Sequence, residues 1–314
     1  MMATVKTQST RSIDFSSREE FEELLTGSEV RVDLAKLKES SRYGVPEEWR
    51  AEVWLYLLGV KQPEKWYSPP SDQRPTDNGF PSSPFSPGYS SSSSSTDSHE
   101  VLKRVRGEVA RYVRARGRSF PQESQAQLPE SLESIVTRYL SANKSKNVES
   151  SLVYMCGVFV YTMKDVRDAA AAFEKMMVMT DEYFRRRDTK TRIAEFHTFC
   201  RALLPDLYSH LEDEEVDFAD WARSWFQFFL SKELPLECVA RLWDTYFSVD
   251  EGIELHLFVC LAILKLCKDS LEELETSDVR AHLLRLPALD MDRVVGEAYN
   301  LKEELIAKEY ISRE

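Results

Sequence analysis

The residues best suited to chemistry on a phosphate lie in one cationic stretch, VLKRVRGEVARYVRARGR from Val101 to Arg118. Within it, Arg104, Glu108 and Arg111 are four and three residues apart, which places all three on one face of a helix. A guanidinium offers planar paired donors and stays charged, so an arginine steadied by a carboxylate suits an anionic ligand. A solvated basic face would show the same periodicity, and both interpretations stay open at this point.

A second stretch, from Val148 to Thr162, predicts a buried helix that follows a polar loop and contains Tyr154, Cys156 and Gly157. A cysteine acts as a nucleophile or a redox sensor when a nearby cation lowers the pKa of its thiol. No histidine or lysine adjoins Cys156 in the sequence. We therefore expect Cys156 to be a small packed residue rather than a reactive one.

Other kinds of catalytic or metal chemistry find little support in the sequence. The five cysteines and five histidines form no pattern typical of a metal site. The acidic run from Leu211 to Asp217 lacks the glycine turn of a calcium loop, so it predicts a solvated loop. Neither a glycine-rich phosphate loop nor a nucleophile elbow occurs. We expect no metal, no cofactor of the protein's own, and reduced cysteines in the cytosol.

The net charge and hydropathy of the sequence limit the kinds of molecule that the protein is expected to bind. The 314 residues carry a formal net charge of −12, with 41 Lys and Arg against 53 Asp and Glu. This balance argues against nucleic-acid binding through a broadly basic surface, so any role toward phosphate must be local. The most apolar run, from Leu255 to Cys267, is 13 residues long and therefore too short to cross a bilayer. The first residues do not resemble a signal peptide, and no lipidation motif ends the sequence.

The elements that must position these residues are helices. Apolar residues recur at helical spacing along most of the chain, and few segments alternate as strands do. The sequence therefore predicts an all-α fold, an irregular array of many helices. The expected helices begin near residue 18 and near Pro46, and then cover 101–116, 131–141, 150–162, 165–186, 189–211, 218–231, 236–247, 253–268, 276–285 and 291–311.

Two segments depart from this helical pattern. Residues 1–17 have little apolar periodicity and predict a flexible amino terminus. Residues 67–99 are dense in proline and serine, which predicts a disordered insertion whose Ser-Pro steps are candidate phosphorylation sites. Because the helices on either side of the insertion are incomplete alone, we expect a single helical domain over 18–314.

Three blocks of sequence share a pattern with one known family. The first is GVPEEWRAEVWLYLLG (44–59), with its glycine, proline, arginine and tryptophan; the second is DLYSHL (206–211); the third is LPLECVARLWDTYFS (234–248). Together they resemble the TBC domain, the GTPase-activating domain for Rab proteins. The resemblance covers residues from about 42 to 300 and implies the irregular helical fold of Rab-GAP TBC domains. Arg50, Trp54, Trp243 and Asp244 would then build the core.

The resemblance also implies roles for individual residues. In the TBC family, an arginine from an I-x-x-D-x-x-R motif and a glutamine from a Y-x-Q motif enter the active site of the GTPase. The stretch from Val105 to Arg111 keeps an apolar residue, an acid and an arginine at that spacing. This implies that Arg111 is the arginine finger and that Glu108 orients it. Arg104, Tyr154 and Gly157 become candidates for GTPase binding.

The second motif departs from the family at its central residue. Tyr154, Met155, Cys156 and Gly157 place a cysteine where the family has glutamine. A thiol is shorter than an amide and a weaker hydrogen-bond partner, so we do not expect Cys156 to be catalytic. The missing amide would then come most readily from the GTPase itself. Gln125 and Gln127, in the preceding loop, are alternatives that nothing in the sequence selects.

These resemblances imply a protein that binds a Rab-class small GTPase and stimulates its GTP hydrolysis in vesicle traffic and intracellular protein transport. It would be a GTPase activator rather than a stand-alone enzyme, with GTP and Mg²⁺ belonging to the partner. The main alternative is a catalytically degenerate TBC scaffold that docks a GTPase or another protein. A third is an adaptor whose basic helix binds acidic peptides or an anionic membrane. The expected location is the cytoplasm, with peripheral association with endomembranes left open.

Overall fold

The computed structural model describes residues 9–27, 31–64 and 94–312, and its regular elements within them are helices, as predicted. An isolated bridge between Arg31 and Glu64 is the only β pairing in these ranges. The α-helices are α1 (Ser9–Thr26), α2 (Leu34–Ser41), α3 (Glu47–Leu57), α4 (Ser94–Arg116), α5 (Gln122–Gln125), α6 (Leu128–Ala142), α7 (Ser150–Thr162), α8 (Val166–Arg186), α9 (Thr189–Leu203), α10 (Pro205–Asp213), α11 (Phe218–Phe228), α12 (Leu236–Ser248), α13 (His256–Glu272), α14 (Thr276–Leu284) and α15 (Met291–Ala307). Two short 3-10 turns, η1 (Gly117–Ser119) and η2 (Gly252–Leu255), follow α4 and precede α13.

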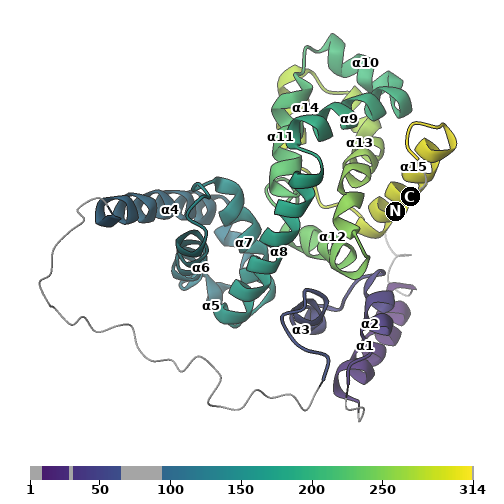
Figure 1. Ribbon diagram of the computed structural model, residues 1–314. Coiled ribbons are helices and arrows are strands. Elements are labelled where there is room, and N and C mark those ends of the chain that lie inside the picture. Colours follow the sequence, from purple (N-terminus) through teal and green to yellow (C-terminus); the bar gives the residue numbers. More distant parts are fainter. Residues whose placement is uncertain (1–8, 28–30, 65–93, 313–314) are drawn as a thin grey trace, which may run out of the picture.

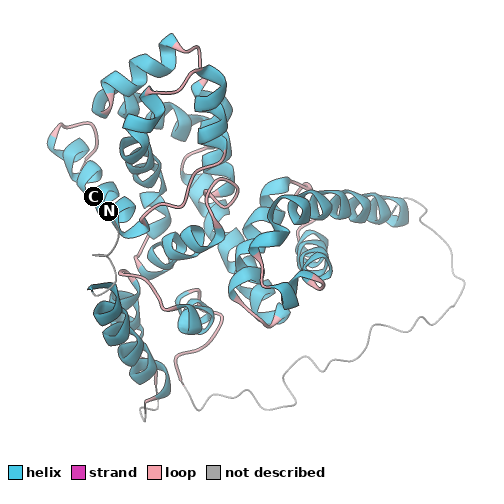
Figure 2. Ribbon diagram, turned by 180° about the vertical axis from the view of Figure 1, so that it is seen from behind, coloured by secondary structure: helices cyan, strands magenta, loops and turns pink. Residues whose placement is uncertain are grey.

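The helices form two groups joined by α7, α8 and α12 (Figure 1). One group contains α4 to α7, and the other contains α9 to α15. Helices α2 and α3 pack against α12, and α1 packs against α2. Figure 2 shows the molecule from behind. The all-α expectation and the single helical array are therefore confirmed over the described residues.

Some helices begin earlier than the sequence pattern predicts. Helix α1 begins at Ser9, within the segment predicted to be flexible, and α4 begins at Ser94, inside the predicted insertion. Once the later turns of a helix are anchored by packing, extending it upstream adds a hydrogen bond for each residue fixed. Residues 1–8 and the part of the predicted insertion at 67–93 lie outside the described residues.

Two further differences concern short helices. Helix α2 has no clear signal in the sequence pattern: it is an eight-residue helix capped by the Asp33 side chain. The single helix expected over 189–211 is two helices, α9 and α10, separated at Leu204. Pro205 has no N–H to continue the hydrogen-bond ladder, but its fixed φ suits the first turn of a new helix.

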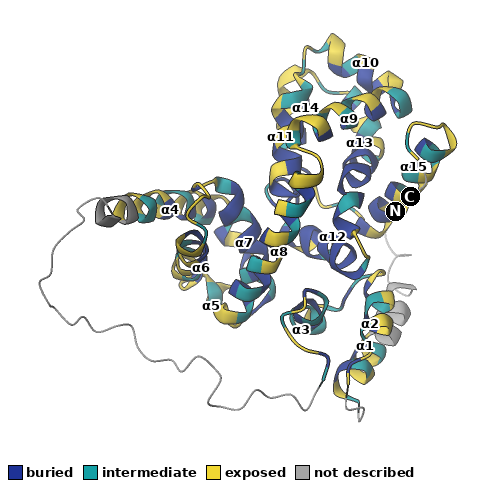
Figure 3. Cartoon of the chain, in the orientation of Figure 1, coloured by how far each residue is buried: buried dark blue, intermediate teal, exposed yellow. Residues whose placement is uncertain are grey.

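Helix α7 is the buried axis of the molecule, and its predicted bounds are those observed. It contacts α3, α4, α6, α8, α11 and α12. Phe159, fully buried on α7, packs its ring edge-on against Trp54 at 5.7 Å and beside Trp243 at 5.5 Å. Buried positions accordingly dominate α7 and its neighbour α12 in Figure 3. The candidate residues on α7 are thus held by a core that involves most of the chain.

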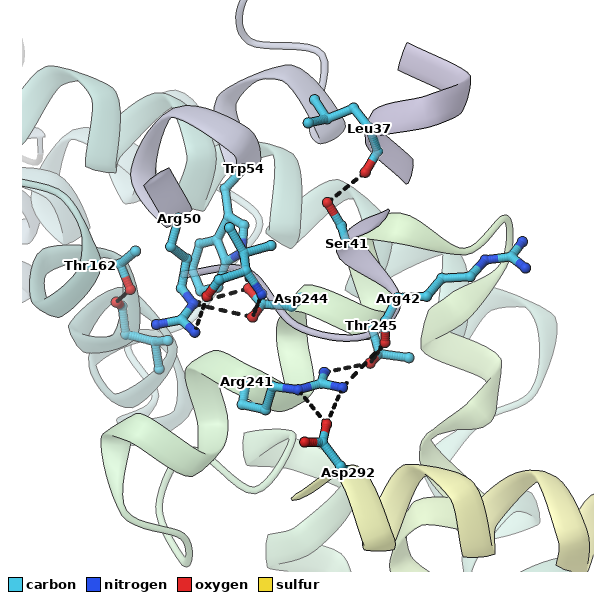
Figure 4. A network of polar contacts seen from close by, with 12 residues as sticks. Leu37, Ser41, Arg42, Arg50, Trp54, Thr162, Arg241, Asp244, Thr245 and Asp292 are labelled. Atoms are coloured by element: carbon cyan, nitrogen blue, oxygen red, sulfur yellow. Dashed lines mark hydrogen bonds and ion pairs between the residues drawn. The ribbon is translucent and has the colours of Figure 1, made fainter. Parts of the chain in front are cut away.

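A fully buried carboxylate, Asp244 on α12, holds the amino-terminal helices against this core (Figure 4). It accepts hydrogen bonds from the Trp54 indole at 2.7 Å, the Val45 backbone at 2.9 Å and the Arg50 guanidinium at 3.1 Å. Burial raises the pKa of Asp244, while the charge of Arg50 and the hydrogen bonds from Arg50, Val45 and Trp54 oppose that shift. A buried charge is tolerated because every acceptor position has a donor.

Asp244→Ala should therefore lower the free energy of unfolding by about 3 to 5 kcal/mol, because it leaves the buried Trp54 indole and the Arg50 guanidinium without their acceptor. Urea denaturation of the full chain measures this change. Asp250→Ala is the matched control, since Asp250 pairs with Lys38 at 2.6 Å but its side chain is 89 % exposed. The control should leave the midpoint unchanged. Equal losses in the two variants would contradict this account of Asp244.

The connection between α11 and α12 buries a second carboxylate, Glu233, which is 1 % exposed. Its Oε1 atom accepts a hydrogen bond from Ser224 at 2.6 Å, and its Oε2 atom has no partner among the described residues. Burial raises the pKa of Glu233 to about 7, although Ser224, Lys232 and Arg116 favour the charged form. The end of α4 is bonded to the same connection, because the Arg116 guanidinium donates a hydrogen bond to the Lys232 carbonyl.

Because the pKa of Glu233 is raised, we expect the free energy of unfolding to depend on pH. An isosteric variant without the carboxyl group should lose that dependence. The folded state keeps the Glu233 proton up to about pH 7, whereas the unfolded chain releases it near the usual value of 4.5. Stability is therefore lost as pH rises from about 4.5 through 7. Over that window Glu233→Gln should gain roughly 3 kcal/mol relative to wild type, measured by urea denaturation at several pH values. A constant difference between the two proteins would contradict this assignment.

Candidate functional site

The predicted arginine and its acid lie where α4 packs against the first turn of α7. The Glu108 carboxylate accepts hydrogen bonds from Arg111 Nε at 3.2 Å and from the Ser150 hydroxyl at 2.7 Å. Partial burial opposes ionisation of Glu108, but the bonds from Arg111 and Ser150 and the charge of Arg104 hold its pKa below the usual value. Glu108 therefore remains an anion that fixes Arg111 to the α4–α7 junction.

Arg111 points out of the molecule, with a side chain that is 62 % exposed. Glu108 is the more enclosed partner, with a side chain that is 18 % exposed. This arrangement leaves part of the guanidinium open to an incoming anion while the carboxylate limits its rotamers. Arg104 is also exposed, about two turns before Arg111 on the same face of α4, and forms no ion pair among the described residues.

Tyr154 and Gly157 serve the packing between the same two helices. The Tyr154 ring meets Tyr112 of α4 edge-on at 4.9 Å and Phe228 of α11 at 5.3 Å. A Cβ placed on Gly157 would lie 2.1 Å from the Tyr112 hydroxyl oxygen. A glycine is thus required at position 157 for α4 to approach α7 this closely. Tyr154 remains partly exposed, whereas Gly157 is buried.

Cys156 does not share this surface. It is fully buried, and burial raises the pKa of its thiol well above the usual value. At about 100° per residue, Cys156 lies about 120° around α7 from Ser150, which faces α4. The thiol therefore points into the core, in agreement with the expected packed residue. The four other cysteines are also buried and unpaired.

The loop glutamines are separated from this junction. Gln125 uses its amide to donate to the Phe120 carbonyl at 2.9 Å. Gln127 lines a groove of about 1090 Å³ that includes Phe120, Val160 and Tyr161, at the far end of α7. Neither glutamine lies beside Arg111 and Ser150.

Two residues of interest were missed by the sequence analysis. Ser150 anchors Glu108, and its position as the first residue of α7 was the only signal for it. Arg118, in turn η1, is exposed and has no ion pair within the described part of the chain. It belongs to the same cationic stretch as Arg111 and is a second arginine that could meet an anion.

Metal and membrane chemistry can be assessed for the described ranges. No group of three or more His, Cys, Asp and Glu side chains there is arranged to hold a metal ion. No helix in these ranges is both long and apolar enough to cross a membrane. His256 is buried between the Tyr246 hydroxyl and the Trp225 carbonyl, and burial lowers its pKa to about 3, so it belongs to the core.

The close approach at Gly157 generates a stability prediction. Gly157→Ala should cost about 1 to 3 kcal/mol, because the new methyl group displaces the buried Tyr112 ring. Gly296→Ala in α15 is the control: its added Cβ meets nothing within 4 Å, so it should stabilise the helix by about 0.5 to 1 kcal/mol. Urea denaturation measures both changes. A neutral Gly157→Ala would contradict the tight contact between α4 and α7.

Known proteins with similar sequences carry the same domain. Human TBC1 domain family member 22A is 24% identical over 335 residues, which cover 96% of this chain and 62% of that protein. Human TBC1 domain family member 22B is 26% identical over 316 residues, covering 90% of this chain and 61% of that protein. The chain therefore spans about three fifths of the length of these relatives.

Solved structures with a similar fold include the Ypt/Rab-GAP domain of Gyp1p, with a TM-score of 0.63 and 16% identity, covering 93% of this chain and 99% of that one. A Chlamydomonas flagellar RabGAP TBC domain gives a TM-score of 0.64 and 17% identity over 95% and 96% of the two chains. These likenesses establish the fold. The family model of the Rab-GTPase-TBC domain matches residues 47–272, most of the sequence. The chain thus belongs to the Rab-GTPase-TBC domain family.

Proposed function

We propose that this protein binds a Rab-class small GTPase at the junction of α4 and α7 and stimulates its GTP hydrolysis through Arg111. The observation that carries the proposal is the exposed Arg111 guanidinium, held by a Glu108 carboxylate that Ser150 fixes in turn. Hydrolysis of GTP builds negative charge on the transferred phosphoryl group, and an arginine supplied by a partner protein stabilises that charge. Pre-orientation by Glu108 reduces the rotamer entropy lost when Arg111 enters the site.

The proposal assigns the nucleotide chemistry to the GTPase. GTP and Mg²⁺ belong to the partner, and this protein contributes charge and position rather than a cofactor. Since Cys156 faces the core, its thiol does not orient the attacking water, so an amide must come from another residue or from the GTPase. We place the activity in vesicle traffic, with the protein in the cytoplasm and acting peripherally at endomembranes.

Single-turnover GTP hydrolysis across a panel of Rab GTPases tests the role of Arg111. Arg111→Ala should lower the stimulated rate by roughly 10³- to 10⁵-fold, the range found for an arginine finger. Arg106→Ala is the matched control, because Arg106 is also on α4, is also 62 % exposed and pairs with Glu133 on α6. The control should retain the wild-type rate.

Two outcomes would contradict the assignment of Arg111. Equal rates for wild type and Arg111→Ala would remove the arginine role from this residue. A loss confined to Arg118→Ala would transfer that role to the unpaired arginine of η1. Thermal unfolding of each variant shows whether a lost rate reflects a lost fold.

The burial of Cys156 favours a second candidate function, a TBC scaffold that docks a GTPase or another protein without activating it. Without a water-orienting amide at the motif position, binding can persist while stimulation is lost. GTPase binding with no stimulation by wild type, across the whole panel, would support the scaffold. Binding is measured with GTPases loaded with a non-hydrolysable GTP analogue.

A further inference from the structure

The residue that could supply the missing amide lies on a helix remote in sequence from both motifs. Gln227 is near the end of α11, and its side chain is exposed. No hydrogen bond occupies its amide among the described residues. Both the donor and the acceptor of this amide are therefore available to a ligand.

Gln227 meets α7 at the residues next to the anchor of Glu108. A pocket of about 200 Å³ is lined by Gln227, by Ser151 and Met155 of α7, and by Thr180 and Phe184 of α8, among others. Ser151 directly follows Ser150, which binds Glu108 and so positions Arg111. Arg111 and Gln227 thus approach adjoining residues in the first turn of α7, the former through Glu108 and Ser150 and the latter at Ser151.

The angular positions of the residues around α7 explain why Cys156, at the motif position, cannot supply a hydrogen-bonding group here whereas Gln227 can. Relative to Ser150, Tyr154 lies about 40° around the helix, Ser151 about 100° and Met155 about 140°, all in one direction. Cys156 lies about 120° in the other direction, toward the core. Of these positions, Ser150 and Tyr154 are partly exposed, whereas Ser151, Met155 and Cys156 are buried. Gln227 borders α7 at Ser151 and Met155 rather than at Cys156.

The backbone that carries Gln227 is firmly held. Phe228, the next residue, packs edge-on against Tyr154 at 5.3 Å, and Tyr154 packs against Tyr112 of α4 at 4.9 Å. The Phe228 ring also contacts the Lys232 ammonium, which lies 4.7 Å from the ring centre. The Arg116 guanidinium of α4 donates a hydrogen bond to the Lys232 carbonyl. A chain of packed rings therefore fixes α11 relative to the helix that presents Arg111.

The loop glutamines do not share this placement. The amide of Gln125 is already bonded to a backbone carbonyl. The groove of Gln127 includes Val160, which is nine residues beyond Ser151 and so roughly 14 Å further along α7.

We propose that Gln227 supplies the water-orienting amide in place of the residue that Cys156 has replaced. This inference rests on the proposed function. The amide carbonyl accepts a hydrogen bond from the attacking water, while its N–H group donates to the γ-phosphoryl group. The water oxygen bonds to phosphorus as the bond to the β-phosphate oxygen breaks, one proton of the water passes to an oxygen of the transferred phosphoryl group, and the products are GDP and dihydrogen phosphate. No bond to Gln227 forms.

The experiment uses the full chain and a GTPase that the wild-type protein stimulates. Gln227→Ala should lower the single-turnover rate by roughly 10²-fold, as removal of one preorganised hydrogen-bonding group does in other enzymes. Its affinity for the GTPase loaded with a non-hydrolysable analogue should stay within about twofold of wild type. Gln127→Ala, which removes another exposed glutamine, should match wild type in both measurements. Because Gln227 is exposed, its variant should keep the wild-type melting temperature.

A second arm separates Gln227 from the amide of the GTPase. Stimulation should persist when the water-positioning glutamine of the GTPase is replaced by alanine, because the amide then comes from Gln227. Abolished stimulation with that GTPase variant would overturn the inference, as would a wild-type rate for Gln227→Ala. In those two cases the proposed function still stands. If wild type stimulates no GTPase, both the inference and the proposed function fall.

Discussion

The buried carboxylate of Asp244 is the constraint on which the rest of the fold depends. It lies on α12, yet its donors come from Val45, Arg50 and Trp54, nearly 200 residues earlier. A charge with no exposure is tolerable in a protein interior when its acceptor positions are filled. The amino-terminal helices and the late helices therefore need each other. Because α12 and α3 both pack on α7, this polar cluster also sets the position of the helix that carries the site.

The sequence predicts those helices whose first and last residues are determined by neighbouring residues in the chain. Helix α7 was placed correctly because it is apolar throughout and is preceded by a polar loop. The break at Pro205 also had a local cause, but the apolar pattern continued across it and concealed it. The early start of α1 could not be predicted, since extension of a helix into a polar segment depends on the tertiary contacts of its later turns. Residues 18–27 and α2 build a small core of their own around Phe21 and Leu37.

The candidate site likewise combines contacts between residues close in the sequence with contacts between distant helices. The pairing of Arg111 with Glu108 follows from a spacing of three residues, so the sequence contains it. Ser150 reaches Glu108, and Gln227 lies beside the next residue, Ser151, through the packing of α7 against α4 and α11, which a sequence pattern does not encode. Gly157 illustrates the difference: the family pattern marks it, but its physical reason is a Tyr112 hydroxyl contributed by another helix.

The five buried thiols place the protein's cysteine chemistry under the control of its folding. Oxidants and alkylating reagents reach a buried sulfur only when the surrounding structure opens, so the modification rate of each thiol is the fraction of molecules in which it is open times the chemical rate of the exposed thiol. Cys156, Cys200, Cys238 and Cys260 report in this way on α7, α9, α12 and α13 respectively. Because Cys267 also lies on α13, the five thiols together report the opening of four of the helices that form the core.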